Sequence, residues 1–311
     1  MESKENQLEI LPGVRACQFV GKGHIKKHMP CQDAYAFGTS CDGWLVLALA
    51  DGVSNSPHSE TAARIAADAA VESLVTFHTA FPEESAWYSA LRTAMNYALR
   101  KIDELAGEHQ ESFGFETTLA IILLNPGKEM FYIYTGDGGV YLRSENDIIL
   151  LTEKRMRTDD GSVFTLSSGP EYWNYGRKDI SDIQAVLMVT DGVSDVIREG
   201  EDHYALAQCF MQSVESNTEY QSACEKVLQE KRFEVMDDDA SFVLYCQRIN
   251  KIEGIRTVEK EEDTSPQIIA PPASKVFPWD DNESERKQNH FDGILSKTVD
   301  FIQQFFCKPK K

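Results

Sequence analysis

The sequence lacks the features that mark secreted, membrane-spanning or zinc-binding proteins. None of its seven cysteines forms a C-x-x-C pair and their number is odd, so neither a disulfide framework nor a zinc knuckle is expected. No run approaches the roughly 20 apolar residues that cross a bilayer, and the opening MESKENQLEI contains no hydrophobic stretch typical of a secretory signal. We therefore expect a soluble cytoplasmic protein.

Basic side chains are scarce over most of the chain. The 311 residues include 31 Lys and Arg against 50 Asp and Glu, a net charge of −19. Residues 250–311 contain 10 basic and 11 acidic side chains, which leaves a net charge of −18 on residues 1–249. An acidic surface repels the nucleic-acid backbone and attracts cations, so no nucleic-acid partner is expected and divalent-metal binding is favoured. Simple solubility is the competing explanation.

Apolar runs predict one folded domain over residues 1–249, built from interleaved strands and helices. Strand-like runs occupy residues 44–50, 117–124, 130–135, 140–143, 147–152, 185–190 and 240–246. The three runs between 130 and 152, separated by GDGG and SEND, predict an antiparallel meander. Helices are expected over 59–78, 87–109 and about 203–231. Long helices between antiparallel strands indicate an α+β layered domain.

The composition changes after residue 249. Residues 250–290 are charged, contain proline and have no hydrophobic period, which is typical of a disordered linker. Residues 291–311 can form an amphipathic helix whose apolar face consists of Ile294, Val299, Ile302, Phe305 and Phe306. Such a helix suits docking to a partner protein or a membrane surface, and packing back on its own domain is the alternative.

Aspartates follow several of the apolar runs. Asp51 and Asp191 each begin a DGVS sequence directly after such a run, and Asp137 follows the run at 130–135 after one residue. An isolated Asp-Gly pair is most simply a turn, but strand ends of one layered domain can converge. With Asp33 and the acidic run at 237–239, carboxylates occur at five separate places. Either they are dispersed over the surface or cations neutralise them, and oxygen ligands of this kind suit magnesium or manganese.

Six short motifs then occur in a familiar order. They are QDA at 32–34, ADG at 50–52, ETTLA at 116–120, YTGDGG at 134–139, VTDGVSD at 189–195 and DDAS at 238–241. In this order they resemble the motifs of the metal-dependent type 2C serine/threonine protein phosphatases, over about residues 13 to 248. The chain is similar to a divergent, bacterial-type member of that family.

The resemblance implies a fold and a main metal site. The implied fold is a four-layer α/β/β/α sandwich, in which two packed antiparallel β-sheets are flanked by helices. At one edge Asp51 would bridge two Mn²⁺ or Mg²⁺ ions, and the backbone carbonyl of Gly52 would bind one of them. Asp191 matches a second carboxylate ligand, and Asp33 falls at a further ligand position.

The resemblance also implies metal-binding roles for four further aspartates. Asp238, the first residue of DDAS, matches the last ligand of the two-metal site. Asp239 takes that place if the correspondence slips by one residue. Asp137 and Asp195 match positions associated with a third, more weakly held metal ion.

The implied activity is hydrolysis of phosphoserine and phosphothreonine monoesters in proteins. A hydroxide activated by the two metal ions would attack the phosphate in line, with Asp51 and Asp191 as the catalytic carboxylates. Phosphorylated proteins would be the partners, a cognate serine/threonine kinase among them, in a signalling role.

Two positions that depart from the family pattern keep a second function open. Gln32 stands where a metal-binding Glu is common, and Val53 stands where many members carry a His. A neutral amide is a weaker metal ligand than a carboxylate. The alternative function is therefore a degenerate phosphatase, which binds a phosphoprotein or a kinase as a regulatory module without turnover.

A third departure concerns the phosphate. The Arg that usually binds it is replaced by His28, within the basic segment GKGHIKKHMP. This segment offers cationic substitutes for phosphate binding at His24, Lys26, Lys27 and His28. A solvated basic loop is the competing interpretation.

Overall fold

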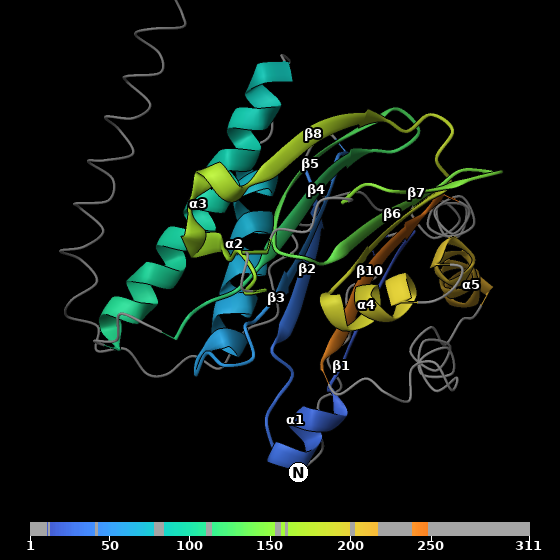
Figure 1. Cartoon of the computed structure of the whole chain (residues 1–311). Coiled ribbons are helices and arrows are strands. Elements are labelled where there is room, and N and C mark those ends of the chain that lie inside the picture. Colours follow the sequence, from blue (N-terminus) through green and yellow to red (C-terminus); the bar gives the residue numbers. More distant parts are fainter. Residues whose placement is uncertain are drawn as a thin grey trace, which may run out of the picture. The chain divides into compact units, whose positions relative to one another are not determined.

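Two antiparallel sheets of five strands each form the centre of the structure, a computed structural model (Figure 1). The described residues are 11, 13–40, 43–77, 84–109, 114–152, 157–158, 161–199, 203–216 and 238–247. All of them belong to the unit formed by residues 9–261, whereas the second unit, residues 1–8 and 262–311, lies outside the described part.

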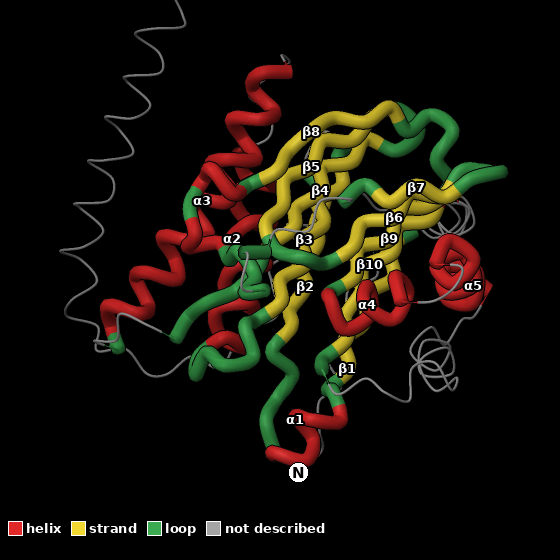
Figure 2. The backbone as a smooth tube through the Cα atoms, in the orientation of Figure 1, coloured by secondary structure: helices red, strands yellow, loops and turns green. Residues whose placement is uncertain are grey.

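One sheet has the strand order β2-β3-β4-β5-β8. Its strands are β2 (Asp33–Thr39), β3 (Leu45–Asp51), β4 (Leu119–Asn125), β5 (Glu129–Thr135) and β8 (Asn174–Asp179). The long helices α2 (Ser59–Phe77) and α3 (Glu84–Glu108) lie side by side on its outer face (Figure 2). Small residues on α2 permit this close packing: Ala62, Ala63, Ala66, Ala67 and Ala70 are all buried.

The other sheet has the order β1-β10-β9-β6-β7. It consists of β1 (Val14–Phe19), β10 (Ala240–Cys246), β9 (Ala185–Val189), β6 (Gly139–Arg143) and β7 (Ile148–Leu150). Helices α4 (Asp191–Glu199) and α5 (His203–Ser216) contribute to the apolar core on its outer face. The short helix α1 (Lys22–Lys27) lies between β1 and β2 in the chain.

Strand alternation explains why the sheets stack in layers. Successive side chains of a strand point to opposite faces. Along β3, Val46, Ala48 and Ala50 pack with α2 and α3, while Leu45, Leu47 and Leu49 pack between the sheets. Along β9, Val186 and Met188 join the core between the sheets, and Leu187 and Val189 face α4 and α5. The structure is therefore the expected four-layer sandwich of two antiparallel sheets flanked by helices.

The predicted meander over residues 130–152 is wrong in its first pairing and confirmed in its second, the β6–β7 hairpin across SEND. β5 pairs with β4 and β8 in one sheet, whereas β6 pairs with β7 and β9 in the other. The GDGG sequence carries the chain from sheet to sheet instead of forming a hairpin turn. Gly136 has φ 103°, and a Cβ on it would lie 2.6 Å from Thr118, so this crossing requires glycine.

The predicted helices agree with the structure where it describes them. Helices α2 and α3 fall within a few residues of the expected ranges, and α5 covers the first part of the helix expected over 203–231. Strands β1, β2 and β8 were not predicted. The linker at 250–290 and the segment at 291–311 lie outside the described residues. None of the described helices is long and apolar enough to cross a membrane.

Candidate metal centre

Two aspartates face each other at one end of the β2–β3 pair. The antiparallel register places Asp33 directly opposite Asp51. Asp51 shares the strand parity of Leu47 and Leu49, so its side chain lies on the face between the sheets. Like charges directly opposite in a sheet destabilise it. The pairing therefore places two mutually repelling carboxylates at the edge of the core.

The backbone around Asp51 is held firmly by the start of β4. Thr118 accepts a hydrogen bond from Asp51 N on its Oγ1 at 3.1 Å, and Thr118 N donates to Asp51 O at 2.8 Å. Thr117 Oγ1 donates to the same carbonyl at 3.0 Å. The adjacent Gly52 has no room for a side chain, because a Cβ there would lie 2.7 Å from the Gln32 carbonyl oxygen. The ETTLA and ADG motifs thus fix the main chain that presents Asp51.

The second sheet contributes a hydroxyl and a third carboxylate. Thr190, directly after β9, donates its Oγ1 hydrogen to Asp33 Oδ2 at 2.9 Å and accepts a hydrogen bond from Ser241 N at 2.9 Å. The next residue, Asp191, begins α4, and its charge acts on the carboxyl group of Asp51. Residues from both sheets therefore meet here.

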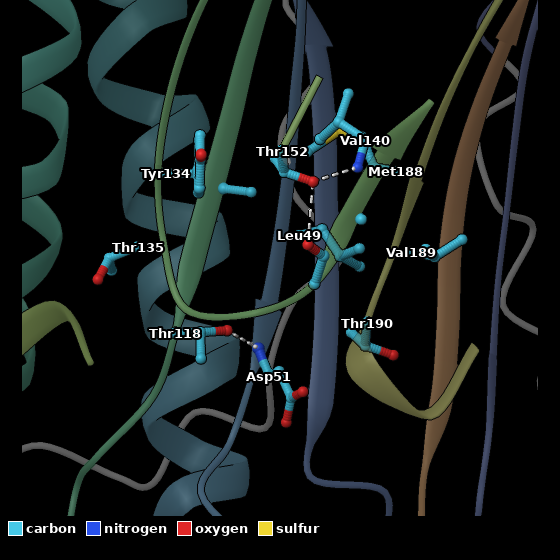
Figure 3. A pocket seen from close by; sticks show the side chains of 13 residues that line it. Leu49, Asp51, Thr118, Tyr134, Thr135, Val140, Thr152, Met188, Val189 and Thr190 are labelled. Carbon is cyan, nitrogen blue, oxygen red and sulfur yellow. Dashed lines mark hydrogen bonds between the residues drawn. The ribbon is translucent and has the colours of Figure 1, made fainter. Parts of the chain in front are cut away.

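A pocket between the sheets ends at the same place. It is lined by residues of β3, β4, β5, β6 and β9 and by Thr152. Figure 3 shows Asp51 and Thr190 at one end of this pocket, on opposite sheets, with Thr118 bonded to the Asp51 backbone. Thr152 closes another side, since its Oγ1 accepts a hydrogen bond from Val140 N at 3.0 Å and donates to Gly138 O at 3.2 Å.

The neighbouring residues Asp238 and Asp239 have different surroundings. Asp238 is exposed, and its charge acts on both Asp51 and Asp191. Asp239 is buried and accepts hydrogen bonds from the backbone N of Gly21 and Gln32 at 2.7 and 2.6 Å. Its Oδ2 also lies 2.8 Å from the Nδ1 of His24. The carboxylate of Asp239 is thus engaged in hydrogen bonds within the fold, whereas that of Asp238 is exposed and accepts a hydrogen bond from Asp239 N at 2.9 Å.

Burial and mutual repulsion raise the pKa values of the clustered carboxyl groups. The pKa of Asp33 lies well above its usual range because of burial, and the hydrogen bond from Thr190 opposes the increase. Burial, and then the charge of Asp191, raise the pKa of Asp51. Burial, and then the charge of Asp137, raise the pKa of Asp191 to about 6. A bound cation would reverse these effects by neutralising the negative charge.

Asp137 and Asp195 extend the acidic cluster. Asp137 is buried and forms an ion pair with Arg157. The Arg157 Nη2 also lies 3.8 Å from Asp191 Oδ2. Asp195 is half-buried and follows Asp191 by one turn of α4, so both lie on the same side of the helix. A guanidinium group therefore supplies positive charge between Asp137 and Asp191.

The donor chemistry of this cluster fits a hard divalent cation. All the ligands on offer are oxygens. The side-chain amide oxygen of Gln32 is buried without a hydrogen-bond partner, beside the Asp33–Asp51 pair in the chain. In the described part of the chain, no three His, Cys, Asp or Glu side chains already form a complete ligand set. The carboxylates and the Gln32 amide oxygen are the groups that would hold such an ion.

The basic segment after β1 lies partly in the core and partly in solvent. His24 is buried against Asp239, whereas Lys26, Lys27 and His28 are exposed. His28 ends α1 in a left-handed conformation with φ 56° and ψ 35°. Of the four cations suggested for phosphate binding, the last three remain accessible to a ligand.

Thr190 and Arg157 contribute to this site without having been predicted, and Asp239 has a role that differs from the predicted ones. Thr190 lies within the quoted VTDG motif, so its place after a strand was a usable signal. Arg157 lies on a different segment, and nothing in its local sequence indicates a contact with Asp137. The role of Asp239 as a buried acceptor of hydrogen bonds could not be told from that of its neighbour Asp238.

The model of a family described as Protein phosphatase 2C matches residues 20–230, more than half of the chain. No curated protein gives a significant match.

Solved structures with a similar fold include several bacterial phosphatases. A bacterial serine phosphatase is 15% identical with a TM-score of 0.60, over 76% of this chain and 98% of that one. The serine/threonine phosphatase Stp1 from Staphylococcus aureus is 15% identical with a TM-score of 0.59, over 79% and 99%. The catalytic domain of the phosphatase PstP, in complex with two manganese ions, is 16% identical with a TM-score of 0.51, over 75% and 97%. At such identities the likeness shows a shared fold.

Proposed function

Because the chain belongs to the protein phosphatase 2C family, we propose that it is a metal-dependent phosphatase acting on phosphoserine and phosphothreonine in proteins. One observation carries the proposal: Asp33 and Asp51 face each other on adjacent strands, and Asp191 joins them from the other sheet. The PstP domain with two manganese ions, similar in fold, supports the choice of metal.

In this proposal four aspartates and one carbonyl hold two Mn²⁺ or Mg²⁺ ions. The ligands are Asp33, Asp51, the Gly52 carbonyl, Asp191 and Asp238. Bound ions of this kind act as Lewis acids that activate water and offset the charge of a phosphate monoester. The chain itself supplies orientation: its two sheets hold the carboxylates on opposite sides of the centre.

The neighbours of these ligands restrict how they can move. Thr190 holds one oxygen of Asp33, and such outer partners typically change metal affinity 10- to 100-fold when removed. Thr117 and Thr118 hold the backbone of Asp51. Phosphorylated proteins, a cognate kinase among them, are the proposed substrates in a cytoplasmic signalling role.

A third ion between Asp137, Asp191 and Asp195 must compete with Arg157. We expect Arg157→Gln to bind the most weakly held Mn²⁺ about 5- to 30-fold more tightly, because about 1 to 2 kcal/mol of guanidinium pairing no longer opposes the ion. Titration calorimetry measures the affinity directly. Arg177→Gln is the matched control, since Arg177 is an exposed arginine paired with Glu129. Equal isotherms for the two variants would contradict competition by Arg157.

The raised pKa values of the clustered aspartates predict how the stability of the metal-free protein changes with pH. The folded protein retains protons that the unfolded chain has lost, so the contribution of Asp191 to stability falls as pH rises from about 4 through about 6. Metal binding requires the deprotonated carboxylates, so Mn²⁺ should raise the melting temperature more at pH 8 than at pH 5.

Melting curves of wild type and Asp191→Asn, in EDTA and in Mn²⁺, test this expectation. In EDTA at pH 8 the variant should be the more stable by up to roughly 3 kcal/mol, because it removes a charge held next to Asp51 and Asp137. The difference should shrink toward pH 4. A wild type that gains stability relative to the variant as pH rises would contradict the repulsion.

The proposed activity is tested with p-nitrophenyl phosphate and a phosphothreonine peptide. Wild-type protein in Mn²⁺ should hydrolyse both, and EDTA should stop both reactions. Metal stoichiometry is measured in parallel. Stoichiometric metal binding without cleavage of either phosphoester would refute the enzyme.

That result would favour a second function, a regulatory module that binds a phosphoprotein or kinase without turnover. Two observations give it weight. Gln32 offers a neutral oxygen where related proteins commonly have a carboxylate, and Val53 offers no proton donor. The nearby His58 has a half-buried ring that stacks on Phe115, with 4.7 Å between the ring centroids.

A further inference from the structure

The segment between β1 and β2, residues 21–32, forms a loop that a single buried carboxylate closes. We call it the basic loop. Asp239 binds the backbone N of both ends, Gly21 and Gln32, and contacts His24 in the helix between them. The Gln32 carbonyl in turn accepts a hydrogen bond from Gly52 N at 3.1 Å. The loop is thereby attached directly to the strand that carries Asp51.

The charge of this loop is opposite to that of the domain. No Asp or Glu occurs from residue 10 to residue 32, in a chain with 50 such residues. Lys22, Lys26, Lys27 and His28 are exposed on the loop. Since residues 1–249 carry a net charge of −18, the loop is a local basic surface on an acidic protein. Asp33 follows the loop immediately, so this surface adjoins the proposed metal centre.

The exposed side of the loop contributes little to the core. His24 is the one buried side chain that α1 presents, while the side chain of Ile25 is 59% exposed. Packing therefore does not explain why lysines and a large apolar residue are placed together here. A surface of this composition suits a peptide that carries carboxylates and an apolar side chain.

We propose that the basic loop docks the polypeptide part of the substrate and selects segments with acidic residues beside the phosphoserine or phosphothreonine. The inference rests on the proposed phosphatase function and names its substrate class. Charge complementarity supports it, because the net negative charge of the rest of the domain repels such a segment and the basic loop attracts it. The phosphate would lie at the metal centre, and the flanking acidic side chains would lie against Lys22, Lys26 and Lys27.

The test compares two phosphothreonine peptides of equal length, one with Glu and Asp beside the phosphothreonine and one with Gln and Asn. Wild type should prefer the acidic peptide about tenfold in kcat/KM, as two or three exposed charge pairs would provide. In the double variant Lys26→Gln/Lys27→Gln the ratio should fall to about 1. Higher salt should reduce the wild-type ratio.

The matched control is Lys128→Gln/Lys178→Gln, which removes the same charge elsewhere. Lys128 lies in the turn between β4 and β5, and Lys178 pairs with Met130 next to that turn. This is the opposite end of the sheet from Thr118 and Asp51, roughly 20 Å away along a seven-residue strand. The control should keep the wild-type ratio.

Three outcomes would overturn the docking proposal. A wild type without preference for the acidic peptide does so directly. If Lys26→Gln/Lys27→Gln lowers kcat/KM equally for both peptides, the lysines contact the phosphate itself and not the flanking acidic residues. If no substrate is turned over, the phosphatase function fails instead, and fluorescence anisotropy of the two labelled peptides then decides docking: equal affinities would refute it.

Discussion

Asp191→Asn is expected to lower kcat/KM for p-nitrophenyl phosphate by roughly a thousandfold or more in the presence of Mn²⁺. The proposed ions contribute several kcal/mol of charge stabilisation, and about 4 kcal/mol corresponds to that factor. Asparagine keeps the shape of the side chain and still suits a helix start, but it removes the charge that faces Asp51. The loss should therefore appear as weaker metal binding without unfolding.

Kinetics over a range of Mn²⁺ concentrations and titration calorimetry separate metal affinity from turnover. Asp103→Asn is the control, because Asp103 is an exposed carboxylate on α3. It should leave both quantities within about twofold of wild type, as expected of a surface change. A turnover by Asp191→Asn within twofold of wild type, at an unchanged half-saturating Mn²⁺ concentration, would remove Asp191 from the proposed centre.

Asp239→Asn is expected to destabilise the protein by about 3 kcal/mol, because an amide cannot replace a buried carboxylate that interacts with Gly21, His24 and Gln32. For a domain of this size the melting temperature in EDTA should fall by roughly 6 to 12 °C. The neighbouring change, Asp238→Asn, should leave that temperature nearly unchanged and raise the half-saturating Mn²⁺ concentration at least tenfold.

The two variants together decide which aspartate of the DDAS motif is a ligand. Both remove one carboxylate charge at the start of β10, so they control for each other. The reverse result, a stable Asp239 variant with weak metal binding and an unstable Asp238 variant, would assign the ligand role to Asp239. It would also remove the support for the basic loop as a surface fixed by Asp239.

The sequence predicted the strands whose apolar residues are continuous. β3, β9 and β10 are buried on both faces, so their runs carry a clear signal, and Asp51 and Asp191 could be placed at strand ends from it. β8 alternates between exposed and half-buried residues at a sheet edge and contains Gly176, so its pattern is weak. Its existence depends on pairing with β5.

Sheet membership and register were beyond local sequence patterns. A glycine-rich connection between two apolar runs has the same sequence pattern whether it forms a hairpin turn or leads to a strand of the other sheet. At GDGG the outcome depends on contacts between distant segments, such as Gly136 against Thr118. The same holds for the pairing of Asp33 with Asp51, because the residues between them do not determine the register of the two strands.

The hairpin geometry also has a consequence for motion. Asp33 and Asp51 lie at the open end of the β2–β3 hairpin, where a ladder separates most easily. Their repulsion favours that separation, and the hydrogen bond from Gly52 N to Gln32 O opposes it. A cation that neutralises both carboxylates would therefore also slow amide hydrogen exchange at the last rungs of the hairpin. Exchange rates at this strand end would then report the occupancy of the metal centre without any substrate.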